Sequence, residues 1–174
     1  MRRWSRSNSP TCCGAWTSEV AKKAERSSRS RSLARRLALQ ALYQWQITAQ
    51  SSAELLNQFA QDEGYPEVDA EYFQELIRGV TAQGEALDAT LAGLIDRPVA
   101  QLDPIEHAVL LIGVYELTQR LETPYRVVIN EGVELAKKFG ATDGHKFVNA
   151  VLDRAARELR AVEYAATPSK LARG

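Results

Sequence analysis

The stretch from Pro124 to Leu152, PYRVVINEGVELAKKFGATDGHKFVNAVL, constrains the fold of this chain more than any other segment. Proline suits the first turn of a helix, and the apolar residues after Pro124 recur at steps of three and four, which is typical of a largely buried helix. Gly140 ends this helix, and Thr142 or Asp143 can cap a second one. The apolar positions are Val128, Ile129, Val133, Leu135, Ala136 and Phe139 in the first helix, and Phe147, Val148, Val151, Leu152 and Ala155 in the second. We therefore predict two packed helices joined by a polar elbow, residues 140–146.

Helical periodicity also extends over most of the remaining chain. We expect a first helix from Ser32 to Ile47, with apolar residues on more than one side. Further helices are expected from after Ser51 or Ser52 to about Asp62, from Asp69 through Val80, through Leu87 to Ile95, and over residues 104–121 with Asp103 as the cap. The last of these contains HAVLLIGVYEL, the most apolar stretch, which is too short to span a bilayer and is expected to be a central buried helix. Because no segment reads as a strand, the predicted fold class is all-α.

The formal net charge of zero conceals a strong asymmetry. Residues 1–36 carry ten Lys or Arg and two Glu, a net charge of +8, whereas residues 37–174 carry twelve Lys or Arg and twenty Asp or Glu, a net charge of −8. A basic arm on an acidic body indicates either a polyanion site at one end of the molecule or a solvated tail.

Three regions are expected along the chain. Residues 1–30 bury too little apolar surface to offset the entropy of ordering, so we predict a disordered basic extension. Residues 31–159 are expected to form the helical domain, and residues 160–174 a flexible tail. One hypothesis for the extension is that translation starts downstream, at Val20; the intact mass of protein made from the native gene tests it.

Four arginines, Arg29, Arg31, Arg35 and Arg36, crowd the start of the first helix. Positive charge at a helix N-terminus opposes the macrodipole, so helix stability does not explain these residues. Arginine binds phosphate with bidentate geometry. Phosphate binding is therefore one interpretation, and ordinary solubilising charge is the other.

The elbow and the residue after it place an acid, a base and an aromatic ring close together, as Asp143, Lys146 and Phe147. On pattern alone, Asp143 is a helix cap, Lys146 a surface charge and Phe147 a core residue. In the alternative interpretation, Phe147 stacks on an unpaired base, Lys146 binds phosphate and Asp143 accepts a hydrogen bond from a base edge, as in many single-stranded RNA sites.

Nothing in the sequence indicates an enzyme. His107 and His145 are the only histidines, and neither has the neighbours needed for a metal cluster or an activated nucleophile. Phosphate-binding and dinucleotide-binding glycine motifs are absent. We predict no catalytic residue, no metal and no cofactor. Cys12 and Cys13 are adjacent, which disfavours a structural disulfide and is consistent with a reducing cytoplasm, and no membrane span is expected.

Several motifs together resemble the bacterial NusB family of transcription antitermination factors. PY, INE, ELAK, FG, HKFVN and VLD occur in order between Pro124 and Asp153, and ALYQWQ, YF and VLLIGVYEL extend the resemblance over roughly Arg31 to Arg157. The resemblance implies about seven helices in two small bundles packed crosswise, and a non-enzymatic protein that binds boxA RNA. The RNA-binding residues that it suggests, with Arg36 added from the arginine cluster, are Arg31, Arg35, Arg36, Asp143, Lys146 and Phe147. Ser32 and Leu33 depart from the family, which can carry basic residues there.

The resemblance also implies partners. The ribosomal protein NusE would bind the first helix and the start of the helix after Asp103, with Tyr43 and Glu106 as the matched candidates. With NusE, the protein would recognise boxA in nascent ribosomal RNA and recruit antitermination factors to RNA polymerase. A homodimer is left open. The alternative function is a helical interaction or dimerisation module without sequence-specific RNA binding. A second rival is the NusB-like domain at the start of some ribosomal RNA methyltransferases; because the sequence carries no catalytic domain or cofactor loop, we expect this rival to be the weaker one.

Overall fold

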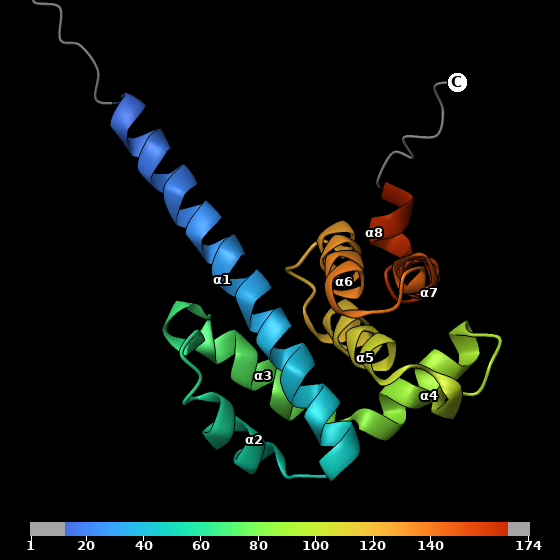
Figure 1. The fold of residues 1–174 in the computed structure, drawn as a ribbon. Helices are drawn as coiled ribbons and strands as arrows, with labels where there is room; N and C mark the ends of the chain where they lie inside the picture. The colour runs from blue at the N-terminus through green and yellow to red at the C-terminus, as the bar shows by residue number, and fades with distance from the viewer. Residues whose placement is uncertain (1–12, 167–174) are drawn as a thin grey trace, which may run out of the picture.

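The protein folds into two groups of helices that meet along a central helix (Figure 1). The computed structural model describes residues 13–166, with side chains from residue 21 onward, and within this span it contains eight α-helices and no strand. The helices are α1 (Cys13–Thr48), α2 (Ser52–Phe59), α3 (Ala70–Ala82), α4 (Gly84–Leu94), α5 (Pro104–Gln119), α6 (Tyr125–Phe139), α7 (Gly144–Leu159) and α8 (Ala161–Ala166), with short 3₁₀ helices at Tyr65–Glu67 and Val99–Gln101. The all-α prediction is confirmed, and the helix count is close to the predicted seven.

The first group consists of α1, α2 and α3. Ser51 and Glu54 form a reciprocal capping box at the start of α2, which satisfies two backbone N–H groups that a helix start leaves unpaired. Asp69 caps α3 by accepting from the Tyr72 N–H group. Both helices therefore begin at a capping residue that the sequence supplies. Helix α3 packs its apolar face against α1.

The second group surrounds α5. Asp103 accepts hydrogen bonds from the N–H groups of Ile105 and Glu106, and Pro104 occupies the first turn, an arrangement that needs no N–H group from the proline. Every residue from Ala108 through Leu117 is buried. Because α5 contacts α1, α3, α4, α6 and α7, the prediction that this helix is central is confirmed.

The N-terminal half of α1 differs from the prediction. Residues 13–30 are helical, not disordered, and α1 projects beyond the body in Figure 1. The packed half of α1 supplies a helix nucleus, so each further residue adds a hydrogen bond without a new nucleation cost. Residues 21–29 are all exposed. The part of the prediction that concerns residues 1–12 lies outside the described residues.

The predicted tail is also partly ordered. Arg160 is only 5% exposed, and α8 follows it. The guanidinium of Arg160 donates to five main-chain carbonyl groups at the C-terminal end of α5 and in the turn after it, those of Glu116, Leu117, Arg120, Leu121 and Thr123. The prediction of a flexible tail is therefore wrong for residues 160–166, because these contacts fix the chain; residues 167–174 lie outside the described residues. No described helix is long and apolar enough to cross a membrane.

Candidate nucleic-acid interface

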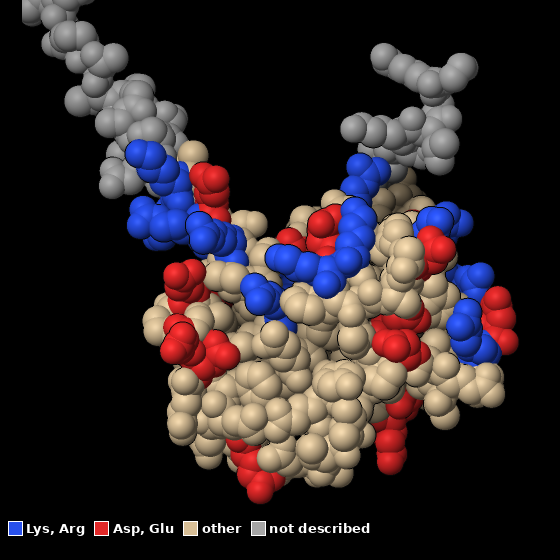
Figure 2. All heavy atoms as spheres, viewed as in Figure 1, with Lys and Arg blue, Asp and Glu red and all other residues tan. Residues whose placement is uncertain are grey.

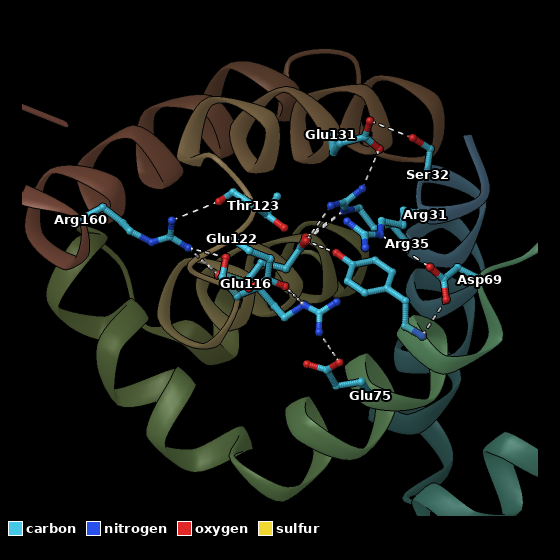
Figure 3. A network of polar contacts seen from close by, with 12 residues as sticks. Arg31, Ser32, Arg35, Asp69, Glu75, Glu116, Glu122, Thr123, Glu131 and Arg160 are labelled. Atoms are coloured by element: carbon cyan, nitrogen blue, oxygen red, sulfur yellow. Dashed lines mark hydrogen bonds and ion pairs between the residues drawn. The ribbon is translucent and has the colours of Figure 1, made fainter. Parts of the chain in front are cut away.

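The arginines near the middle of α1 point in different directions, and Arg35 points inward. It is 3% exposed, and its Nε and Nη2 atoms donate to the Glu116 carboxylate of α5 at 2.7–3.2 Å (Figure 3). Tyr72 also donates to Glu116, and the Glu131 carboxylate lies 3.5 Å from Arg35 Nη1. Burial opposes the charge on Arg35, but the hydrogen bonds and charge of Glu116 outweigh it and raise the Arg35 pKa. This geometry contradicts a direct phosphate contact for Arg35, because its guanidinium is enclosed by protein.

Arg31 and Arg36 reach the surface on opposite sides of α1. The Arg31 side chain is 39% exposed and lies 3.6 Å from Asp69, with its guanidinium over the Tyr72 ring. Arg36 is exposed and lies over the ring of Phe139, the last residue of α6, at 5.7 Å from the ring centre. Of the three predicted arginines, Arg36 alone is thus brought next to the elbow.

A groove of about 420 Å³ runs between α1 and α6 beside Arg36. It is lined by Arg29, Ser32, Leu33, Arg36, Glu131, Glu134, Leu135, Lys137 and Lys138. Figure 2 shows Lys and Arg side chains gathered on the projecting part of α1 and again over α6, on the two sides of this region. Lys137 and Lys138 were not predicted as site residues; the sequence places them in the last turn of a helix, where cations suit the macrodipole without any ligand.

The acids of the groove are already paired. Glu131 accepts a hydrogen bond from Ser32 at 2.8 Å and faces Arg35. Glu134 accepts from Lys137 at 2.7 Å, and this contact lowers its pKa. With these acids compensated, Arg29, Arg36 and Lys138 leave the groove positively charged, which suits a phosphate backbone.

The elbow carries two of its predicted residues on the open surface. Asp143 and Lys146 form an exposed ion pair at 2.8 Å, with side chains 75% and 72% exposed. Asp143 occupies the capping position of α7, but its side chain accepts no capping hydrogen bond, so the cap prediction is wrong for its side chain. Both groups are accessible to a ligand, and each has a partner that the ligand must replace.

Phe147 lies between the core and the surface. The ring is half-buried and packs against the core, while the Arg97 guanidinium lies over it at 4.7 Å from the ring centre. Arg97, in the loop after α4, was not among the predicted site residues, because a loop residue gives no periodic signal. The structure therefore adds an arginine to the elbow, at the ring expected to stack on a base.

Glu106, predicted as a partner contact, lies under the elbow. It is 9% exposed, and a Cβ atom at Gly144 would lie 2.3 Å from its Oε1 atom, so Gly144 and the Glu106 carboxyl group pack directly together. Burial first, and then the charge of Asp103, raises the pKa of Glu106, against the opposing effect of Arg97. Glu106 is therefore too buried to be an exposed partner contact. Its carboxyl group instead packs against Gly144 and supports the elbow.

Tyr43 remains accessible as a partner residue. It is 41% exposed, and Ile47, one helical turn further along α1, is 61% exposed. Gln46, between them, donates to the Pro104 carbonyl group at 3.0 Å and contacts His107 Nδ1 at 2.8 Å. The end of α1 and the start of α5 are thus tied into one surface, as the prediction for partner binding requires.

His107 also contacts Asp88 through Nε2 at 2.7 Å. Among the described residues, no group of three His, Cys, Asp or Glu side chains is arranged to hold a metal ion.

Comparisons with known proteins agree on one family. The family model described as the NusB family matches residues 32–157. The transcription antitermination protein NusB of Marinomonas sp. (strain MWYL1) is 53% identical over 149 residues, which cover 83% of this chain and 86% of that protein.

Solved structures match the fold. The T. maritima NusB structure superposes with a TM-score of 0.70 at 26% identity, covering 78% of this chain and 96% of that one. The crystal structure of the antitermination factors NusB and NusE in complex with dsRNA gives a TM-score of 0.63 at 26% identity, covering 75% of this chain and 98% of the matched chain.

Proposed function

The chain belongs to the NusB family, and from this we propose that it is a non-enzymatic transcription antitermination factor that, together with NusE, recognises boxA in nascent ribosomal RNA. The observation that carries the proposal is the positively charged groove between α1 and α6, which leads through Arg36 and Phe139 to the elbow. A matched fold was solved in complex with NusE and double-stranded RNA, which supports RNA as the ligand and NusE as the partner.

The groove and the elbow have separate tasks in this mechanism. Arg29, Arg36 and Lys138 bind phosphates, which positions the strand and makes affinity depend on salt. The elbow reads the strand through the ring of Phe147 and the Asp143 carboxylate. A base that stacks on Phe147 displaces the Arg97 guanidinium from the ring, and Arg97 then pairs with a phosphate of the bound strand.

NusE binds the surface formed by the end of α1 and the start of α5. Tyr43 and Ile47 supply its exposed apolar contacts. Glu106 acts beneath Gly144 instead of touching the partner, so the helix that NusE contacts also supports the elbow. With NusE bound, the protein joins the antitermination complex on RNA polymerase, a role that belongs in the cytoplasm, where nascent RNA is made.

The second candidate function is a helical interaction module, which the exposed pair Tyr43 and Ile47 favours. In that case the apolar face binds NusE or a second copy of the chain, and the cations only keep the surface solvated. The two functions differ in whether RNA sequence matters.

Fluorescence anisotropy with labelled boxA RNA and a scrambled strand tests the proposal, with and without NusE, at low and high salt. We expect preferential boxA binding that NusE strengthens. Equal, salt-sensitive binding to both strands would contradict base recognition, and tight NusE binding without RNA binding would favour the module. Tyr43→Ala should weaken the NusE-dependent gain alone.

A further inference from the structure

We infer that the projecting part of α1, residues 21–30, is a second RNA contact that holds the strand flanking the recognition element by its phosphates. This inference rests on the proposed function, because it extends the same bound strand beyond the groove. The family model begins only at residue 32, so the projecting segment lies outside the region that the family match covers.

The cations of this segment form one stripe. Lys22, Arg26 and Arg29 follow each other at steps of four and three, and Leu33 and Arg36 continue the same face. At 3.6 residues per turn these five positions fall within about 80° of arc. Arg29 and Arg36 both line the groove against α6, so Lys22 and Arg26 extend the groove wall along the projecting helix.

Within the part of the chain that the structure describes, these cations have no side-chain partner. Residues 21–29 are exposed, and in the described residues no ion pair or ring contact joins Lys22, Lys23, Arg26 or Arg29 to another side chain. Arg31, Arg35 and Arg36, further along the same helix, all have such contacts. The only acid among residues 21–30 is Glu25, which lies at the edge of the stripe.

RNA is the expected ligand of the stripe because of its charge and because the stripe is continuous with the groove. Exposed cations on a projecting helical segment suit a polyanion, and the stripe runs into the groove proposed to hold RNA, as the blue surface of Figure 2 indicates. The fourteen steps from Lys22 to Arg36 at 1.5 Å each span about 21 Å. About six phosphates cover this length at 3.4 Å, the spacing along one strand of a duplex, and fewer cover it in a more extended strand. The contact is to phosphate, so it carries no sequence preference.

The stripe is present whether translation starts at Met1 or at Val20. Lys22, Lys23, Arg26 and Arg29 all follow Val20 in the sequence. The full chain and a chain that begins at Val20 therefore both carry the contact.

The test uses the full chain with NusE and three RNAs. The first is the boxA strand alone. The other two carry about six added uridines, enough to follow the stripe, at the 5′ end or at the 3′ end. The variant is Lys22→Gln/Arg26→Gln, since glutamine keeps helix propensity. The control is Arg78→Gln, which removes an exposed charge from α3, away from the groove.

We expect one of the extended strands to bind the unsubstituted protein more tightly than the short strand. The stripe variant should lose about tenfold in affinity for that strand near physiological salt, with a salt slope lower by about 1.4 for two lost contacts to a single strand. Its binding to the short strand, its helicity and its melting temperature should match those of the control.

An unchanged gain from the extension in the stripe variant would overturn the inference, and so would an equal loss on short and extended strands. Failure of the proposed function looks different. If the unsubstituted protein does not distinguish boxA from a scrambled strand, base recognition is contradicted. The gain in affinity from the added uridines still tests whether the stripe binds RNA.

Discussion

The Nη2 atom of Arg35 in α1 lies 2.7 Å from a carboxylate oxygen of Glu116 in α5, and the two side chains are only 4% and 1% exposed. This pair joins the first helix to the central helix from inside the core. Arg35 therefore stabilises the fold and does not bind a ligand, although it belongs to a basic cluster.

Removing one member of this pair should unfold the protein more easily. Glu116→Leu leaves the buried Arg35 charge with only Glu131, 3.5 Å away, as a counterion. We therefore expect the free energy of unfolding to fall by about 3 kcal/mol, the low end of the range for breaking a buried ion pair. The double variant Arg35→Met/Glu116→Leu should lose less than the sum of the single variants, because it buries no lone charge. Urea denaturation measures all three; additive losses would contradict a direct pairing.

Arg36 should behave in the opposite way. Arg36→Gln removes an exposed cation of the groove, so the salt slope of RNA binding should fall by about 0.7 for one lost contact to a single strand. The free energy of unfolding should change by no more than about 0.5 kcal/mol. Anisotropy titrations over a salt series measure the slope, with exposed Arg78→Gln as the matched control. A slope equal to that of the control would remove Arg36 from the interface.

Phe147 should affect both stability and binding, since its ring is half-buried. Phe147→Ala should weaken boxA binding by about 1–3 kcal/mol if a base stacks on the ring, and should lower the unfolding free energy by about 2 kcal/mol, less than for a fully buried Phe. Phe147→Tyr keeps the aromatic face and should retain binding. A folded Phe147→Ala protein with full affinity would show that the ring is only a packing residue.

Glu106 should make stability depend on pH. Its pKa in the folded protein is raised above the ordinary value of 4.5, so its charged form opposes folding at neutral pH, and this penalty disappears as the pH falls through the raised pKa toward 4.5. Glu106→Gln removes the penalty and should be more stable than the parent protein at pH 7. Thermal melts over a pH series should show this advantage shrinking on acidification; an advantage that grows would reverse the sign.

Gly79 should be intolerant of a methyl group. A Cβ atom there would lie 2.2 Å from the Tyr115 ring, where α3 meets α5, whereas a Cβ atom at Gly93 in α4 meets nothing within 4 Å. Gly79→Ala should lower the unfolding free energy by about 1–3 kcal/mol through overpacking. Gly93→Ala should raise it by about 0.5–1 kcal/mol through helix propensity. Thermal denaturation compares the pair, and similar effects at both sites would contradict the close approach.

Local signals explain what could be predicted from sequence. The caps at Ser51, Asp69 and Asp103 depend on residues two or three positions away, and all three are present. The burial of α5 follows from its composition, which leaves no polar side for solvent. Motif order along the chain was sufficient for the family, because it samples many positions at once.

Partners distant in sequence explain what could not be predicted. Arg35 and Glu116 are 81 residues apart, so nothing near Arg35 distinguishes it from its exposed neighbours. Lys138 joins the site only because α6 faces α1 across the groove. Arg97 reaches Phe147 from a loop, and Glu106 is covered by Gly144 through tertiary packing alone.

The bonds of Arg160 to the end of α5 have a consequence for the order in which the protein matures. A ribosome delivers α5 well before Arg160, and until that residue emerges the last carbonyl groups of the central helix lack the donor that the finished protein gives them. Helices α6 and α7 must both be synthesised in the interval. Arg160 is therefore the last residue needed to pair the carbonyl groups at the C-terminal end of α5. In a nascent chain stalled before Arg160, these carbonyl groups lack that donor.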